Sequence, residues 1–120
     1  MTKTILVVDD ELGYRDMLQM DLSGQGFNVF TAEGGLEALE ILKKEKIDLV
    51  VTDMKMPKMD GLETVIAIKK FHPGIPIVLM TGYAVEDKVQ KALQLKATTC
   101  LRKPFEIEEL TTVIHSALPA

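Results

Sequence analysis

Short apolar segments and amphipathic segments alternate along the whole chain. Five of the apolar segments are rich in β-branched side chains, which favours β-strands. They lie at residues 4–8, 27–31, 47–52, 75–80 and 98–101. The first, third and fourth are nearly continuous apolar runs, as expected for central parallel strands that are covered on both faces.

The segments between and after these strands carry apolar residues at helical spacing. The five stripes are Tyr14, Leu18 and Leu22; Leu36, Leu39 and Leu42; Leu62, Val65 and Ile66; Val89, Ala92 and Leu93; and Ile107, Leu110, Val113, Ile114 and Ala117. The fourth stripe is the weakest, because it is short and its side chains are small. Gly26 and Pro73-Gly74 mark helix ends.

Five consecutive strand–helix units predict an α/β fold. We expect a doubly wound, flavodoxin-like (βα)5 three-layer sandwich with a five-stranded parallel sheet in the order 2-1-3-4-5. The sequence contains no internal repeat, linker or low-complexity segment, so residues 1–120 are predicted to form one domain.

The composition narrows the class of protein. The chain has 120 residues, of which 47% are hydrophobic, and this suits one domain with one core. A net charge of −4 gives no basic surface for nucleic acid or an anionic membrane. No apolar run approaches the roughly 20 residues of a membrane span. The single cysteine, Cys100, cannot form an internal disulfide, which favours a cytoplasmic protein, and two histidines with one cysteine make structural zinc improbable.

Polar residues follow four of the five predicted strands. Asp9 and Asp10 come after the first strand, Asp53 after the third, Thr81 after the fourth, and Lys103 after the fifth. In open parallel sheets, ligands bind beyond the carboxyl ends of the strands, where strand order reverses. With the first and third strands as neighbours, the three aspartates are expected to share one cleft, and the threonine and lysine to lie across it.

Three carboxylates in one cleft repel one another. Two unit charges about 5 Å apart repel by roughly 3 kcal/mol at an effective dielectric constant of about 20. A divalent cation removes this repulsion, and Mg²⁺ suits carboxylates, retained waters and a phosphate oxygen. Lys103 can then bind a phosphate oxygen as a point charge. The cleft thus contains metal ligands, an anion-binding group and a carboxylate nucleophile, which are the parts that phosphoryl transfer requires.

These residues resemble the receiver domain of two-component response regulators in four motifs. The motifs are Asp9-Asp10, Asp53-Met54-Lys55-Met56-Pro57 continuing to Met59-Asp60-Gly61, Thr81-Gly82, and Lys103-Pro104-Phe105. The resemblance covers essentially the whole chain, and the motifs occur in the family's order. Within the family, the chain looks most like single-domain sporulation-relay regulators and the receivers of nitrogen-type activators.

The resemblance implies a role for each acidic residue. Asp53 would be the phospho-acceptor, attacking a phosphohistidine of a partner. Asp10 would ligate Mg²⁺ (or Mn²⁺) directly, Asp9 would act largely through water, and the backbone carbonyl of Lys55 would complete the protein ligands together with Asp53. Asp60 is expected to cap the third helix rather than to bind the metal.

The resemblance also assigns the opposite side of the cleft. Thr81 would bond a phosphoryl oxygen and Lys103 would form an ion pair with it, with the Lys103-Pro104 peptide bond in the cis form. The chain departs from the family at Cys100, where many receivers carry an aromatic residue that swings inward on activation. We therefore expect activation to move the loop after Thr81 and the fourth helix more than the fifth strand.

Three other functions are weaker. Aspartyl-phosphate phosphohydrolases usually carry a second acidic residue two positions after the nucleophile, where this chain has Lys55. A nucleotide- or flavin-binding module would need a glycine-rich phosphate loop, but the first strand–helix connection, residues 8–13, is acidic. An adaptor that has lost phosphorylation would not need the intact set of site residues.

The resemblance therefore implies a signalling switch rather than a metabolic enzyme. Phosphoryl acceptance and autodephosphorylation would be intrinsic to the domain. The expected phosphodonor is a sensor histidine kinase or a histidine phosphotransfer protein. Only Pro119-Ala120 follow the fifth predicted helix, so the output would be a downstream protein target or an effector domain outside this segment. No direct contact with nucleic acid or membrane is expected.

Overall fold

The computed structural model describes residues 2–54, 59–82 and 99–118, which form an α/β sandwich around one parallel sheet. The strands are β1 (Thr4–Val8), β2 (Asn28–Ala32), β3 (Leu49–Asp53), β4 (Ile77–Thr81) and β5 (Thr99–Arg102). The helices are α1 (Leu12–Gly24), α2 (Gly35–Lys44), α3 (Gly61–Phe71) and α5 (Ile107–Ala117). The strand order β2-β1-β3-β4-β5 confirms the predicted topology. The predicted fourth helix, around residues 85–95, lies outside the described residues.

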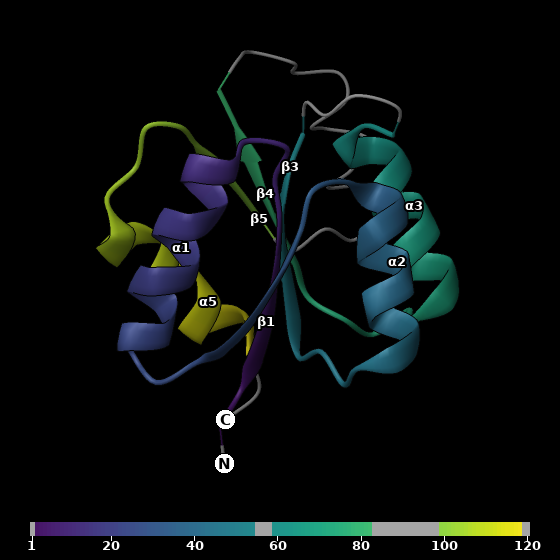
Figure 1. Cartoon of the computed structure of the whole chain (residues 1–120), viewed down its shortest axis with the longest axis horizontal. Coiled ribbons are helices and arrows are strands. Elements are labelled where there is room, and N and C mark those ends of the chain that lie inside the picture. Colours follow the sequence, from purple (N-terminus) through teal and green to yellow (C-terminus); the bar gives the residue numbers. More distant parts are fainter. Residues whose placement is uncertain (1, 55–58, 83–98, 119–120) are drawn as a thin grey trace.

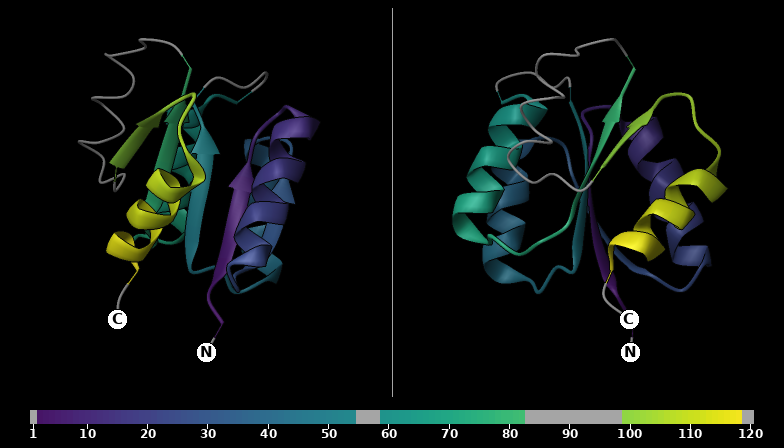
Figure 2. Two further views of the ribbon diagram at one scale, coloured as in Figure 1. Left: turned by 90° about the vertical axis from the view of Figure 1, so that its left-hand side faces the viewer. Right: turned by 180° about the vertical axis from the view of Figure 1, so that it is seen from behind.

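The helices cover the sheet on both faces, with α1 and α5 on one side and α2 and α3 on the other (Figure 1). The turned views in Figure 2 show the same three layers. Each face of the sheet has its own apolar cluster because successive side chains of a strand point in opposite directions. In β1, Leu6 and Val8 pack with α2 and α3, while Ile5 and Val7 pack with α1 and α5. All four side chains are fully buried, as the continuous apolar run predicts.

Strand positions agree with the sequence pattern, although several boundaries lie later in the chain. The predicted strand at 47–52 is observed at Leu49–Asp53, and the one at 75–80 at Ile77–Thr81. Asp48 precedes β3 because its backbone and its carboxylate both pair with Thr4, at the amino edge of the sheet. With these later boundaries, Asp53 is the last residue of β3 and Thr81 is the last residue of β4.

The parallel register brings the carboxyl ends of the strands to one edge of the sheet. Val8 lies opposite Thr52, Asp53 opposite Met80, and Thr81 opposite Arg102. The residues that follow these positions therefore leave the sheet at the same edge. This register, rather than proximity in the sequence, is what positions the candidate site.

Local signals define several helix ends. Asp60 is the N-cap of α3: its side chain accepts from the backbone N–H of Glu63 at 2.9 Å, and the Glu63 carboxylate accepts from the backbone N–H of Asp60 at 3.2 Å. This capping box confirms the expectation for Asp60. After α1, Gly26 adopts a φ of 96°, a left-handed conformation that favours glycine. Within the described part of the chain, no helix has the length and apolar character needed to cross a bilayer.

Candidate active site at the carboxyl edge of the sheet

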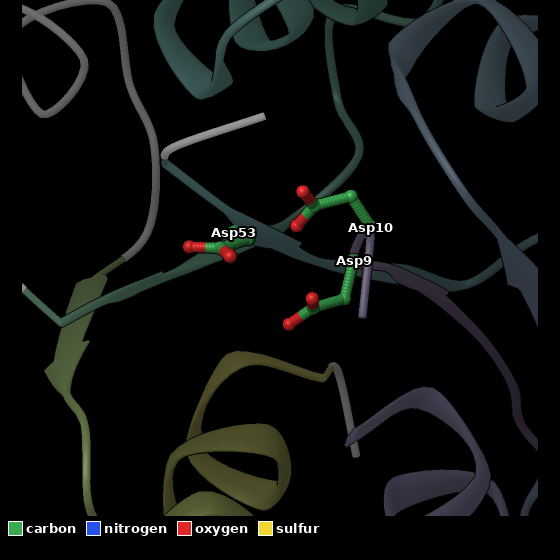
Figure 3. A group of neighbouring side chains, drawn as sticks. All are labelled: Asp9, Asp10 and Asp53. Carbon is green, nitrogen blue, oxygen red and sulfur yellow. The ribbon is translucent and has the colours of Figure 1, made fainter. Parts of the chain in front are cut away.

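Three aspartates from two neighbouring strands form a compact acidic cluster (Figure 3). Asp9 and Asp10 follow β1, and Asp53 ends β3. Each offers a carboxylate oxygen, and these oxygens lie within 4.8 Å of one another. Asp9 and Asp53 are buried, whereas Asp10 is exposed. Oxygen ligands of this kind suit a hard divalent cation such as Mg²⁺ or Mn²⁺, so the donor set fits the predicted metal.

Both carboxylate oxygens of Asp9 already have hydrogen-bond partners. Oδ1 accepts from the backbone N–H of Glu11 at 2.9 Å, and Oδ2 accepts from Lys103 Nζ at 2.9 Å. The guanidinium of Arg15 donates to the backbone carbonyl of Asp9 at 2.7 Å, which ties the loop to the first turn of α1. The carboxylate of Asp9 is thus held in place from two sides.

Lys103 joins the two buried carboxylates of the cluster. Its Nζ lies 2.9 Å from Asp9 Oδ2 and 3.3 Å from Asp53 Oδ2, and its side chain is 16% exposed. Burial alone lowers the pKa of Lys103, but the hydrogen bond to Asp9 and the negative charges of Asp53 and Asp9 outweigh burial and leave this pKa raised. The lysine therefore stays cationic at neutral pH.

The segment that carries Lys103 is fixed by its backbone. The backbone N–H of Lys103 donates to the carbonyl of Thr81 at 2.7 Å, and the Lys103-Pro104 peptide bond is cis, as the family resemblance predicts. Thr81 is buried at the end of β4, beside the strand that bears Asp53. Lys55, whose backbone carbonyl is the remaining predicted ligand, lies outside the described residues.

Gly61 allows the chain to return closely to Asp53. Its N–H donates to the carbonyl of Met54 at 2.8 Å. A Cβ at position 61 would lie 2.6 Å from Met54 Cα and 2.8 Å from the carbonyl oxygen of Asp53, which is too close for any side chain. Glycine is therefore required for α3 to begin directly beside the backbone of Asp53 and Met54.

Cys100 lies in β5, three residues before Lys103. It is partly buried and packs against the apolar cluster shared by α2 and α3. Burial raises the pKa of the Cys100 thiol, and the positive charge of Arg102 only partly opposes this effect. The thiol is therefore an uncharged, small packing group at the position where many receivers carry an aromatic ring.

Sequence reasoning missed the contact of Tyr14 with Lys103. Its apolar spacing with Leu18 and Leu22 predicts a core position, and the ring does pack against that core. The ring also lies under the Lys103 ammonium, 4.1 Å from its centroid to Nζ. Burial raises the pKa of the Tyr14 hydroxyl, so the phenol stays neutral. The available signal was its position in the first turn of the helix that follows Asp9-Asp10.

A hollow of about 270 Å³ opens beside Asp10 at the N-terminus of α2. Its lining includes the carboxylates of Glu33 and Glu37 and the exposed side chain of Leu36. These groups add negative charge to the edge that already carries the three aspartates. Among the described residues, this part of the edge is therefore rich in carboxylates.

Comparison with known proteins places this geometry in a family. Residues 5–115 match the family model described as the response regulator receiver domain. The chain is 40% identical over 119 residues to sporulation initiation phosphotransferase F of Bacillus subtilis (strain 168), covering 99% of this chain and 96% of that protein. It is 41% identical over 114 residues to the transcriptional regulatory protein ZraR of Klebsiella oxytoca, covering 95% of this chain but only 26% of that protein.

Solved structures give the same result. A response regulator receiver domain protein from Clostridium thermocellum superposes with a TM-score of 0.92 at 35% identity, covering 96% of this chain and 93% of that one. The chemotaxis protein CheY4 of Vibrio cholerae superposes with a TM-score of 0.93 at 32% identity, covering 98% and 100% of the two chains. From the family model, the relatives and the shared fold, we conclude that this chain belongs to the response regulator receiver domains of two-component and phosphorelay signalling.

Proposed function

We propose that the chain is a phosphorylation-controlled switch in which Asp53 accepts a phosphoryl group from a phosphohistidine in a Mg²⁺-dependent reaction. One observation carries the proposal: a single ammonium, that of Lys103, bonds both Asp9 and Asp53 inside a cluster of three carboxylates whose oxygens lie within 4.8 Å. This arrangement supplies a nucleophile, an acidic cation site and a positive charge within reach of the nucleophile.

The metal would be held by Asp9, Asp10 and Asp53, together with the backbone carbonyl of Lys55. When bound, Mg²⁺ or Mn²⁺ would neutralise the carboxylates and the charge of an incoming phosphoryl group. Because both oxygens of Asp9 already have hydrogen-bond partners, this residue suits a role through water, whereas the exposed carboxylate of Asp10 suits direct ligation.

The chemistry forms one bond and breaks one bond. A carboxylate oxygen of Asp53 attacks phosphorus, and the phosphorus–nitrogen bond of the phosphohistidine breaks. The bonding electron pair stays on the imidazole nitrogen, and because the second ring nitrogen of the phosphohistidine carries a proton, the partner's histidine leaves as neutral imidazole. Lys103 remains protonated and exchanges a carboxylate oxygen for a phosphoryl oxygen, while the hydroxyl of Thr81 donates to another. In autodephosphorylation, water attacks the same phosphorus, the bond between phosphorus and the Asp53 oxygen breaks, inorganic phosphate is released and Asp53 returns to a carboxylate.

The partner would be a sensor histidine kinase or a histidine phosphotransfer protein. We propose residues 1–120 as one receiver domain in the cytoplasm that signals through protein contact, either with a separate target or with an effector domain. Direct contact with nucleic acid or with a membrane is not part of the proposal, because the segment has a net charge of −4.

The test is phosphorylation with a small donor. Protein incubated with acetyl phosphate and Mg²⁺ should gain one phosphoryl group by intact-mass analysis, and Asp53→Asn should gain none. Asp60→Asn is the matched control, because asparagine also caps helices and this acid lies outside the cluster. Labelling of Asp53→Asn equal to that of the wild type would refute the assignment of Asp53.

A further inference from the structure

The ammonium of Lys103 has a third contact besides its two carboxylates. An ammonium carries three N–H donors, of which one points to Asp9 and one to Asp53. The aromatic ring of Tyr14 lies 4.1 Å from Nζ, which is within the range of a cation–π interaction. Lys103 is thus bounded by negative oxygens and by the electron-rich face of a ring.

The Tyr14 ring is itself held in place by neighbouring structure. Tyr14 lies in the first turn of α1, and its ring meets Phe105 edge-on, with centroids 6.2 Å apart and planes at 90°. Phe105 comes two residues after Lys103, so the aromatic pair links α1 to the segment that bears the lysine. The contact joins residues that are far apart in the sequence.

We propose that Tyr14 is a positioning residue for Lys103, whose ring face keeps the ammonium at the point from which it reaches the oxygens of Asp53 or of a group attached to it. This inference rests on the proposed function of Asp53. When a phosphoryl group is added, the lysine must exchange carboxylate oxygens for phosphoryl oxygens. The ring contact needs no exchange, because a π face does not compete for the N–H donors aimed at the anion.

A structural role for Tyr14 would make different predictions. If the ring only fills space in the core, both Tyr14→Leu and Tyr14→Phe should leave binding at the site nearly unchanged. If the ring positions Lys103, Tyr14→Phe should behave as the wild type, because phenylalanine keeps the π face. Tyr14→Leu should be impaired although it remains apolar and folds.

The experiment measures binding of beryllofluoride, a mimic of the acyl phosphate, at saturating Mg²⁺. We expect Tyr14→Leu to raise the dissociation constant by about 3- to 10-fold, because it loses a half-buried cation–π contact. Tyr14→Phe should keep the dissociation constant of the wild type. Phe27→Leu is the matched control, since it removes a ring from the same apolar cluster without touching Lys103 and should leave the constant unchanged.

A second measurement does not need the mimic, and its decisive reading is made on the wild type. In the wild type, the ε-methylene protons of Lys103 should resonate upfield of those of the other lysines because of the ring current of Tyr14. The shift should persist in Tyr14→Phe and vanish in Tyr14→Leu. A Lys103 signal without this shift in the wild type would overturn the inference.

The outcomes separate the two proposals. If the wild type binds beryllofluoride and Tyr14→Leu binds it equally well, or if Tyr14→Phe is as impaired as Tyr14→Leu, only the role of Tyr14 is overturned. If the wild type binds no beryllofluoride and accepts no phosphoryl group, the proposed function falls and the role of Tyr14 falls with it.

Discussion

The two edges of the sheet use aspartate in opposite ways. At the amino edge, the Asp48 carboxylate accepts a hydrogen bond from the backbone N–H of Thr4 at 2.8 Å, so this charge has a partner within the fold. At the carboxyl edge, the ammonium of Lys103 bonds the carboxylates of Asp9 and Asp53, and the carboxylate of Asp10 lies in the same cluster. The first arrangement stabilises the fold as it stands. The second brings three carboxylates together, and a divalent cation bound there would lower their mutual repulsion.

The largest expected effect is that of Lys103→Met in the metal-free protein. Asp9 is fully buried and would lose its cationic partner, and removing one member of a buried pair costs about 3 kcal/mol at the lower end of the usual range. We expect the free energy of unfolding, measured with urea, to fall by about this amount. Saturating Mg²⁺ should recover most of the loss, because a bound cation neutralises the same carboxylates.

Lys69→Met is the matched control for this experiment. Lys69 donates to the backbone carbonyls of Pro73 and Ile75, away from the acidic cluster. Any stability lost in this variant should not be recovered by Mg²⁺. Equal recovery in both variants would show that the metal acts elsewhere, and the contrast between the two edges would lose its basis.

The next effect belongs to the amino edge. Asp48→Ala leaves the Thr4 N–H without its carboxylate partner, and the loss of a partly buried charged hydrogen bond should lower the free energy of unfolding by about 1–2 kcal/mol. Mg²⁺ should not change this difference. Denaturation curves with and without the metal test it, and a Mg²⁺-dependent difference would mean that the edges are coupled.

The fold could be predicted from the sequence because its signals are local and repeated. Apolar runs and helical stripes alternate, so the strand order and the covering of both faces follow from a small set of α/β topologies. Strand boundaries were less predictable. Asp48 lies before β3, where its carboxylate bonds the backbone N–H of Thr4, 44 residues away. No local sequence pattern reveals this contact.

The grouping of the candidate site residues was predictable, but their contacts were not. Residues at strand ends converge by topology, so the grouping of Asp9, Asp10 and Asp53 could be expected from strand order. The pairing of Lys103 with Asp9, 94 residues apart, and with the ring of Tyr14 depends on how loops and side chains pack. A tyrosine in an apolar helical stripe looks like any core residue until the lysine beside it is seen.

A smaller effect of opposite sign is expected from Asp10→Asn. Removing one charge from the cluster relieves repulsion, and because Asp10 is exposed we expect the metal-free protein to gain only about 1 kcal/mol. The variant should also lose most of the rise in melting temperature that Mg²⁺ gives the wild type. Thermal denaturation across a Mg²⁺ titration measures both. Metal-free stability equal to the wild type would show that the carboxyl edge is not strained by its own charge.

The smallest effect concerns Cys100 in β5, whose thiol pKa is changed mainly by burial rather than by neighbouring charges. Its thiol pKa is raised above the ordinary value of 9.0 by burial, against a weaker opposing effect of Arg102. A group whose pKa is higher in the folded state contributes stability that is fully present below the unfolded pKa and is lost as pH rises through the folded pKa. Above pH 9, the wild type should therefore lose stability relative to Cys100→Ala, whereas below pH 8 the difference should be constant. Taking the difference between the two proteins cancels the titration of every other group. Alkylation by iodoacetamide at pH 8 should also be slower in the folded protein than in urea, because less thiolate is present. A difference between the proteins that does not change with pH would show that the thiol titrates as it does in the unfolded chain.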